Sequence, residues 1–353
     1  MVNNLHERPG VYSAYDTSSV VSGGRAVRSI GVAAKAARGE TGKPVTVTGW
    51  AAGVSVFGED ETAGMSTLLR LLFENGASAV TAVRVAEEGT AEDYAQAFAA
   101  LEKEEAQILV CDSGEEAVHQ ALRNAVEAAS ALRHERIAVA GCAGAEVSEL
   151  VSRAEALNSE RVVLVGPDAL DSGGKPLSGV FAAAAVAALA ASAPDPAVPL
   201  NGAKLKGLTG LAEDYTDNDI DRLVRGGVTP LECVAGVVSP VRGITTRTKT
   251  GGAADATWRE LTTILIVDDV IPSVRSALRS RFSRSKNNAR NRAAIRSQVI
   301  VELEKKLAAE IIDGYDEVRV SASHEDPTVC LVEFGFAVAH GLNQVHLTVH
   351  IEI

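Results

Sequence analysis

The side chains best suited to metal chemistry in this sequence are three histidines near its end. His340, His346 and His350 form the closest set, and His346 and His350 fall on one face of an alternating segment. Zinc sites usually draw on short-spaced pairs of His or Cys, and neither a thiol nor a second such pair accompanies these histidines. A solvated strand face explains them better, so no metal ion is expected.

Paired carboxylates and glycine-rich turns offer the other chances for chemistry. Asp268 and Asp269 precede Pro272, where a helix is expected to begin, so they would complement the helix dipole without a catalytic role. A Walker motif needs Lys followed by Ser or Thr, but proline follows both Lys43 and Lys175. Residues 141–144 (GCAG) supply only part of G-x-G-x-x-G and are typical of a tight turn. We expect no catalytic residue and no cofactor, and a nucleotide-dependent α/β enzyme remains the alternative.

The composition is that of a globular protein long enough for two domains. The 353 residues are 46% apolar, and 34 Lys and Arg stand against 46 Asp and Glu. The net charge of -12 argues against nucleic acid as a partner for the whole surface. The four cysteines lie far apart and are expected to be free thiols. Residues 180–193 are Ala-rich and too short to span a membrane, which predicts a buried helix and no membrane insertion.

Periodicity divides the chain into three parts. Residues 1–22 indicate an extended N-terminal arm. Residues 23–200 alternate apolar runs (45–48, 79–85, 107–111, 136–140, 161–165) with helical patterns (91–103, 115–132, 147–157), which predicts a helix-covered parallel sheet. Three prolines within residues 193–199 mark the boundary. Residues 201–353 predict an α+β domain with a helix at 217–225, a strand at 258–267, a broken helix pair at 272–312 and strands at 316–323, 328–338 and 343–353.

The last of these strands has the most regular alternation in the sequence. One face would carry Val345, Leu347, Val349, Ile351 and Ile353. A strand at a chain end must pair inside its own domain or be donated to a neighbour. The residues alone leave both possibilities open.

Three segments resemble phage tail sheath proteins. Residues 207–231 (GLTGLAEDYTDNDIDRLVRGGVTPL) and 243–270 (GITTRTKTGGAADATWRELTTILIVDDV) carry the strongest likeness, and Pro9, Gly10, Val11 and Tyr12 resemble the start of such proteins. The resemblance implies a subunit that polymerises around an inner tube and contracts to drive the tube through a target envelope. It also implies strand exchange between subunits, through Pro9 to Tyr12 at one end and Val345 to Ile353 at the other.

The resemblance further implies the partners and the location. The partners would be other copies of the chain, the inner tail tube protein, and baseplate and tail-terminator proteins, with no direct nucleic acid contact. The chain would assemble in the bacterial cytoplasm and end in a virion tail or tail-like particle.

A local inversion of charge suggests where the tube is contacted. Eight cations, with no acidic residue among them, lie between positions 270 and 301: Arg275, Arg279, Arg281, Arg284, Lys286, Arg290, Arg292 and Arg296. In a helix from about residue 289, Arg292 and Arg296 would share a stripe with Val299, Leu303 and Leu307. That end of the stripe would leave its core and meet something acidic. The resemblance suggests the tube; a solvated face, internal ion pairs or nucleic acid are the alternatives.

Overall fold

The chain divides into two compact units. The computed structural model describes residues 28–60, 64–86, 88–144 and 146–343. The first unit, called the α/β unit, includes residues 28–193, 198–262 and 340–343 of the described chain. The second, called the helix–ribbon unit, includes residues 194–197 and 263–339.

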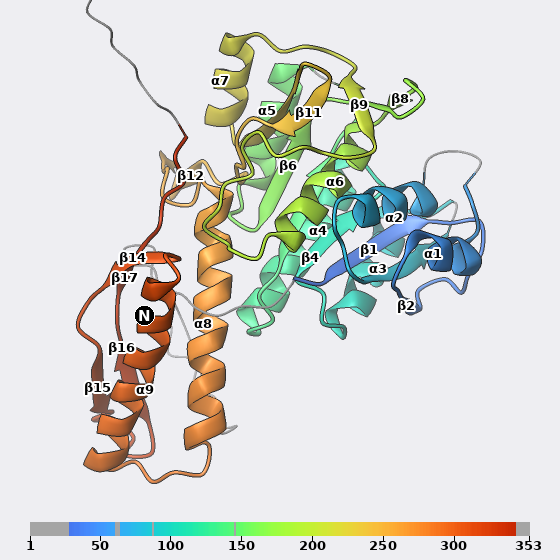
Figure 1. Ribbon diagram of the computed structural model, residues 1–353. Coiled ribbons are helices and arrows are strands. Elements are labelled where there is room, and N and C mark those ends of the chain that lie inside the picture. The colour runs from blue at the N-terminus through green and yellow to red at the C-terminus, as the bar shows by residue number, and fades with distance from the viewer. Residues whose placement is uncertain (1–27, 61–63, 87, 145, 344–353) are drawn as a thin grey trace, which may run out of the picture. The chain divides into compact units, whose positions relative to one another are not determined.

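An eight-stranded sheet is the centre of the α/β unit (Figure 1). Its order is β11-β10-β6-β5-β4-β1-β3-β2, and all neighbours are parallel except the two outer pairs, β2 with β3 and β11 with β10. The strands are β1 (Ile30–Lys35), β2 (Pro44–Val47), β3 (Val80–Val85), β4 (Ile108–Cys111), β5 (Ile137–Gly141), β6 (Val162–Gly166), β10 (Val228–Val234) and β11 (Val237–Pro240). The five strands predicted between residues 45 and 165 are confirmed.

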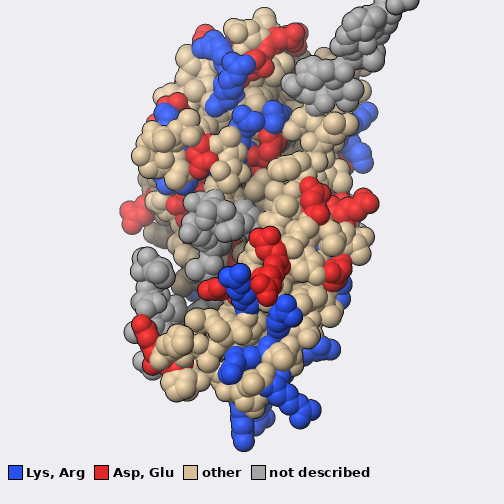
Figure 2. All heavy atoms as spheres, turned by 90° about the vertical axis from the view of Figure 1, so that its left-hand side faces the viewer, with Lys and Arg blue, Asp and Glu red and all other residues tan. Residues whose placement is uncertain are grey.

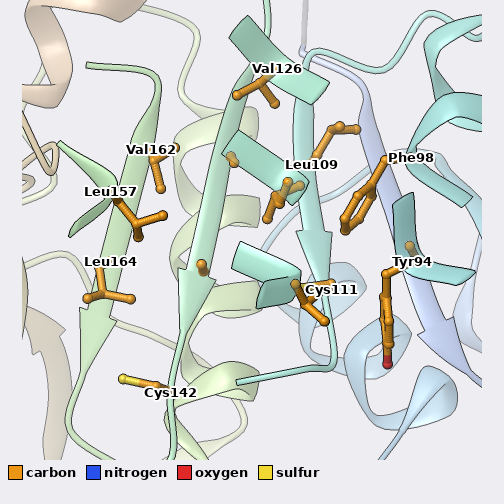
Figure 3. Close-up of a cluster of buried hydrophobic side chains, with 14 of the residues drawn as sticks. Tyr94, Phe98, Leu109, Cys111, Val126, Cys142, Leu157, Val162 and Leu164 are labelled. Atoms are coloured by element: carbon orange, nitrogen blue, oxygen red, sulfur yellow. The ribbon is translucent and has the colours of Figure 1, made fainter. Parts of the chain in front are cut away.

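Helices cover both faces of this sheet, as expected for a parallel arrangement. On one face lie α1 (Trp50–Phe57), α2 (Met65–Glu74) and α6 (Gly179–Ser192); on the other lie α3 (Ala91–Glu102), α4 (Glu116–Ala131) and α5 (Val147–Leu157). Figure 3 shows the core beneath the second group, where Phe98 of α3 lies near Leu109 of β4, and Leu157 of α5 lies near Leu164 of β6. The three helices predicted between residues 91 and 157 are confirmed.

The Ala-rich helix α6 is buried on almost every side, as predicted. Ser178 caps it, its side chain accepting a hydrogen bond from the Val180 N–H. The turn at residues 141–144 lies beside the N-terminus of α6. A Cβ on Gly141 would stand 2.2 Å from the Gly179 carbonyl oxygen, so only glycine allows the two backbones to approach this closely. The described residues contain no helix both long and apolar enough to cross a membrane.

The compact units differ from the domain boundary predicted at residue 200. The prolines do interrupt regular structure, but the chain then returns to the α/β unit. β9 (Leu208–Leu211) pairs with β7 (Ala169–Asp171), which also pairs with β8 (Pro176–Leu177), in a separate three-stranded sheet. The helix α7 (Asp217–Arg225) then leads into β10 of the eight-stranded sheet. Residues 198–262 therefore complete the α/β unit. The capped helix predicted at 217–225 is confirmed.

The helix–ribbon unit consists of two long helices and a two-stranded ribbon. The helices are α8 (Leu261–Phe282, its first two residues lying in the α/β unit) and α9 (Ala289–Ala308). The ribbon is formed by β14 (Ile312–Tyr315) with β17 (Phe336–Val338), and β15 (Arg319–Ala322) with β16 (Cys330–Glu333). Apolar side chains such as Val270 and Val274 of α8, Leu303 of α9 and Phe336 of the ribbon form its core.

Two sequence predictions are corrected in this part of the chain. The strand predicted at 258–267 is wrong, because α8 begins at Leu261 and contains Pro272 in its interior. Residues 264–267 are all buried, and continuous burial removes the helical period from the sequence. The single strand predicted at 328–338 is two strands, interrupted at Gly335, whose carbonyl accepts the Asp316 N–H at 2.8 Å. Most of the strand predicted at 343–353 lies outside the described residues.

Candidate assembly surface

The eight predicted cations gather around the connection between α8 and α9. Arg275, Arg279 and Arg281 belong to the C-terminal half of α8, Arg284 and Lys286 to the connector, and Arg290, Arg292 and Arg296 to α9. Six of the eight side chains are exposed; Arg275 and Arg292 are half-buried. Figure 2 shows blue side chains crowded at the lower end of the view, where acidic side chains are sparse. The structure thus brings the predicted residues together on one end of the unit.

Four of these cations already have partners, Arg275 among them, and the contacts of the other three lie within their own unit. Arg281 donates to the side-chain oxygen of Gln298. Arg292 Nη1 donates to Asn287 Oδ1 at 3.0 Å. Arg296 Nε donates to the Val318 carbonyl at 2.8 Å, and its Nη2 lies 4.0 Å from Glu317 Oε1.

The hydrogen bonds of Arg292 and Arg296 within the unit change what was expected of the N-terminal end of the apolar stripe on α9. Val299 and Leu303 are buried as predicted, but Arg296 turns back to the loop that precedes β15. The N-terminal end of the stripe therefore keeps polar contacts with its own unit. Among the described residues, no ion pair or side-chain hydrogen bond involves the exposed cations Arg279, Arg284, Lys286 and Arg290. We call these four the free cations.

A buried ion pair holds α8 against α9. Lys306 Nζ lies 3.1 Å from Asp269 Oδ2, and the two side chains are only 7% and 6% exposed. The expectation that Asp268 and Asp269 precede a helix is wrong. Both lie inside α8, which begins at Leu261, well before Pro272. Such a pair tolerates few other alignments of the two helices, since sliding either helix would leave a buried charge without its partner.

The ribbon leaves both of its edges open within the described chain. β14 and β15 pair with β17 and β16, and the structure gives none of these four strands a second neighbour. Unpaired edge strands present N–H and C=O groups that can accept another strand. The residues predicted to exchange strands (Pro9, Gly10, Val11, Tyr12, Val345, Leu347, Val349, Ile351 and Ile353) lie outside the described residues.

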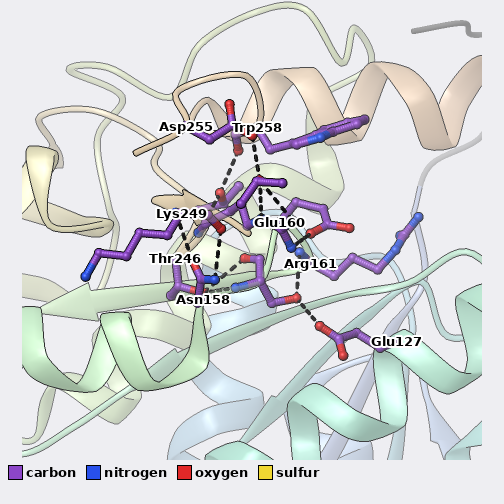
Figure 4. A network of polar contacts seen from close by, with 12 residues as sticks. Glu127, Asn158, Glu160, Arg161, Thr246, Lys249, Asp255 and Trp258 are labelled. Atoms are coloured by element: carbon purple, nitrogen blue, oxygen red, sulfur yellow. Dashed lines mark hydrogen bonds and ion pairs between the residues drawn. The ribbon is translucent and has the colours of Figure 1, made fainter. Parts of the chain in front are cut away.

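The Thr-rich segment after β11 is fastened to the α/β unit by a polar network (Figure 4). Asn158, in the left-handed conformation at φ 38, accepts the N–H groups of Thr248 and Lys249 at 3.1 and 3.0 Å. Thr246 Oγ1 accepts the Ser159 N–H at 3.0 Å, and Ser159 Oγ donates to Glu127 at 2.6 Å. The result is a fixed base for the small hairpin of β12 (Lys249–Thr250) and β13 (Ala253–Ala254).

A carboxylate also stabilises this hairpin. Thr250 Oγ1 donates to Asp255 Oδ2 at 2.6 Å, and this bond, with others from Thr257, lowers the pKa of Asp255 to about 2. Sequence reasoning noted the threonines only as part of a resemblance. Nothing in their spacing indicated that the Thr246 hydroxyl would bond to Ser159, 87 positions earlier.

The carboxyl ends of the parallel strands, where α/β enzymes bind ligands, are filled by the chain's own carboxylates. Asp60 Oδ2 accepts the Ser66 N–H at 2.7 Å at the start of α2. Asp168 accepts the Gly179 N–H at 2.6 Å at the start of α6, and the Gly144 N–H at 3.1 Å. A phosphate bound at a helix N-terminus needs these donors. The geometry thus disfavours the nucleotide-dependent enzyme considered above.

Other titratable groups at this end of the sheet serve the fold. Tyr94 donates to Asp112 Oδ1 at 2.5 Å, and burial raises the pKa of the Asp112 carboxyl. His119 lies buried on α4 with its Nε2 3.0 Å from the Ser113 carbonyl, and burial lowers its pKa to about 4. Within the described ranges no three His, Cys, Asp or Glu side chains could hold a metal ion; His340 is exposed there, and His346 and His350 lie outside them.

Known proteins match most of the chain. The family model for the phage tail sheath protein central domain matches residues 87–246, and that for the phage tail sheath C-terminal domain matches residues 253–352. A tail sheath protein of Bacillus phage SP01 is 28% identical over 258 residues, which are 71% of this chain and 44% of that protein. The chain thus spans less than half the length of this relative.

Solved structures show the same fold. The sheath tail protein of Desulfitobacterium hafniense aligns with a TM-score of 0.70 at 13% identity, covering 93% of this chain and all of that one. The helical sheath of the anti-feeding prophage in its contracted state aligns with a TM-score of 0.73 at 15% identity, covering 99% and 100%. The comparisons define a class, that of the tail sheath proteins. This chain belongs to the phage tail sheath family, whose members are structural proteins and not enzymes.

Proposed function

We propose that this chain is the structural subunit of a contractile sheath, which polymerises around an inner tube and contracts to drive the tube through a target envelope. The observation that carries the proposal is the open two-stranded ribbon, in a chain whose terminal segment has the strongest alternation in the sequence. A strand donated by one copy to the ribbon of the next makes a head-to-tail contact. Such contacts continue into a helical array unless the rotation closes.

Strand exchange between subunits is also compatible with contraction of the polymer. Ladder hydrogen bonds would tether neighbouring subunits while the α/β units reorient, so that other interfaces can be exchanged without dissolving the polymer. The extended sheath would be kinetically trapped above the contracted one, which requires no nucleotide or other cofactor at the moment of firing. Baseplate and terminator proteins would start and end the array, within a tail or tail-like particle.

Deletion of residues 345–353 tests strand exchange. Purified full-length chain, alone at high concentration or with inner tube protein, should form hollow tubes visible by negative-stain microscopy. The truncated chain should keep the circular dichroism of the α/β unit and form no ordered tubes. Deletion of residues 2–22 is the matched variant at the other end. Normal tubes from both truncated chains, or a full-length chain that never exceeds a dimer, would contradict the proposal.

We further propose that the end of the unit around the α8–α9 connection contacts an acidic surface of the inner tube. The free cations support this, because four uncompensated charges around one connection attract an acidic partner and none of them makes an ion pair or side-chain hydrogen bond in the described chain. Arg281, Arg292 and Arg296 are bonded within the unit and would contribute less to the contact. Among the eight predicted residues this ranks Arg279, Arg284, Lys286 and Arg290 first, ahead of the four that already have partners, Arg275 included.

Charge reversal distinguishes the two groups. A variant with Arg279, Arg284, Lys286 and Arg290 changed to Glu should fail to sheathe tube protein at low salt, whereas the wild type should lose sheathing gradually as salt screens the contact. The matched control changes Arg281, Arg292 and Arg296 to Gln and should still sheathe the tube if the fold survives. Undiminished, salt-independent sheathing by the first variant would rule the contact out.

A further inference from the structure

The short helix α1 has an outer surface unlike that of an ordinary surface helix. Its eight residues, WAAGVSVF, include no charged side chain. Trp50 is 40% exposed, and Ala51, Ala52 and Ser55 are exposed as well. The one hydroxyl, on Ser55, donates to the Ala51 carbonyl of the same helix at 3.0 Å. The outer face is therefore apolar.

The inner face of α1 is fully used by its own unit. Gly53 lies so close to α2 that a Cβ there would stand 2.5 Å from Leu69 Cδ1, and Phe57 is 1% exposed. A helix that is apolar all round is normally buried on all sides. Within the described residues Trp50 stays 40% exposed, and Ala51 and Ala52 are exposed beside it, which leaves this face open to a covering group from elsewhere.

The size of this face limits what can cover it. A helix of eight residues is about 12 Å long and about 10 Å across, so its one outer face offers on the order of 100 Å², far less than the roughly 800 Å² per partner that a stable independent complex buries. A separate protein would not be held by this face alone. A subunit already tethered by other contacts needs no large interface, and the small side chains of Ala51 and Ala52 allow its backbone to come close.

The position of α1 also suits a contact between neighbours. It packs beside β2, which ends the eight-stranded sheet and pairs only with β3 in the described chain. The face therefore lies at an outer edge of the α/β unit, away from the sheet's core.

We propose that a second copy of this chain covers the α1 face, including its largest side chain Trp50, in the assembled polymer. The inference rests on the proposed function, and it adds a contact through the α/β unit to those made by the arms and the ribbon.

Fluorescence of the native protein tests this directly, because Trp50 and Trp258 are the two tryptophans and Trp258 is only 2% exposed. The Trp50 signal is the difference between wild type and a Trp50→Phe variant. In free subunits this signal should be quenched by acrylamide. In tubes it should shift to shorter wavelength and resist the quencher.

Each other outcome has a distinct meaning. A Trp50 that stays accessible in tubes overturns the inference while leaving the sheath function intact. A Trp50 already shielded in free subunits also overturns it, because the chain's own segments then cover the helix. Absence of tubes under all conditions contradicts the proposed function and the inference together.

A charge at the same position gives a second measurement. Trp50→Glu should raise the concentration needed for tube formation by about tenfold or more, since a large apolar side chain loses its burial. Trp50→Phe should assemble nearly as wild type. Circular dichroism of unassembled Trp50→Glu checks the fold, and wild-type assembly by a folded Trp50→Glu chain would overturn the inference.

Discussion

The two units of the molecule satisfy their backbone and side-chain groups to very different degrees. In the α/β unit, a helix-covered sheet is closed at its carboxyl end by Asp60 and Asp168, and the segment after β11 is bonded to Asn158 and Ser159. In the helix–ribbon unit, two helices share a buried ion pair, but the ribbon edges and the free cations have no partner within the described chain.

From this difference we infer that the α/β unit contributes mainly to stability and the helix–ribbon unit mainly to assembly. A unit in which most strands have two neighbours and most buried polar groups are paired gains little by meeting a partner through them, whereas open edges and uncompensated charges gain a great deal. The α/β unit is best understood as the more fully packed of the two, with an apolar outer face at α1. The helix–ribbon unit is where we expect most of the bonds between chains to form.

The strongest test of the comparison is the ion pair inside the helix–ribbon unit. Asp269→Asn should lower the free energy of unfolding of that unit by about 3 to 5 kcal/mol, because Lys306 is left charged and buried. Hydrogen exchange during denaturation should show residues 263–339 opening early while the α/β unit keeps its protection.

A double variant separates charge from packing in the same place. Asp269→Leu combined with Lys306→Met removes both charges and should recover most of the lost stability, as seen for other buried pairs replaced by apolar side chains. If Asp269→Asn instead costs no more than an exposed pair does, about 1 kcal/mol or less, the pair does not fix the helices.

The second test concerns the α/β unit and acid. The pKa of His119 is lowered from 6.5 to about 4 by burial, against the opposing effect of its bond to Ser113. The unfolded chain therefore binds more protons between these values, so stability is complete above pH 6.5 and falls as the pH drops toward 4. We expect a loss of roughly 3 kcal/mol across this window.

Denaturant unfolding of wild type and His119→Gln, followed from pH 7 to pH 4, measures this effect. The substitution should flatten the dependence of the α/β unit's stability on pH over that window. The helix–ribbon unit provides the internal comparison, since it contains no buried histidine among its described residues. If the stability of wild type and of His119→Gln fell equally with pH, His119 would not be the group responsible.

The smallest expected effect is at the start of α7. Thr216 Oγ1 accepts the Asp219 N–H at 3.3 Å, and Asp219 in turn accepts the Thr216 N–H, which forms a capping box. Thr216→Ala should lower the stability of the α/β unit by about 1 kcal/mol. Thr216→Ser, which keeps the hydroxyl, is the control. A loss of several kcal/mol would mean that α7 is needed to hold β10 in the sheet.

Local signals predicted most of the α/β unit, and non-local packing explains the misses. Residues 107–111 and 161–165 could be read as strands because short apolar runs bounded by polar residues have few alternatives. The cap at Thr216 was visible for the same local reason. The extent of the α/β unit could not be predicted from the sequence. The pairing of β10 with β6 joins Val228 to Leu164, and no pattern in either segment indicates the other as its partner.

The helix–ribbon unit shows more clearly what local sequence patterns cannot predict. Strong β-formers such as Ile264 and Val267 favoured a strand, but burial against the rest of the fold made them helical. Asp269 was visible as a carboxylate, yet its partner Lys306 lies 37 positions away. The eight cations could be found by composition alone, whereas the bonds that remove Arg281, Arg292 and Arg296 from the free set depend on the paired helices.

The alanine-built helix α6 has a mechanical consequence. Alanine has no side-chain rotamers to exchange, and along Gly179–Ser192 it brings the helix backbone close to the sheet. A core made this way has few soft degrees of freedom and low compressibility. In the contracting sheath proposed above, such a body would transmit force with little internal deformation, so that the work of contraction would move the tube.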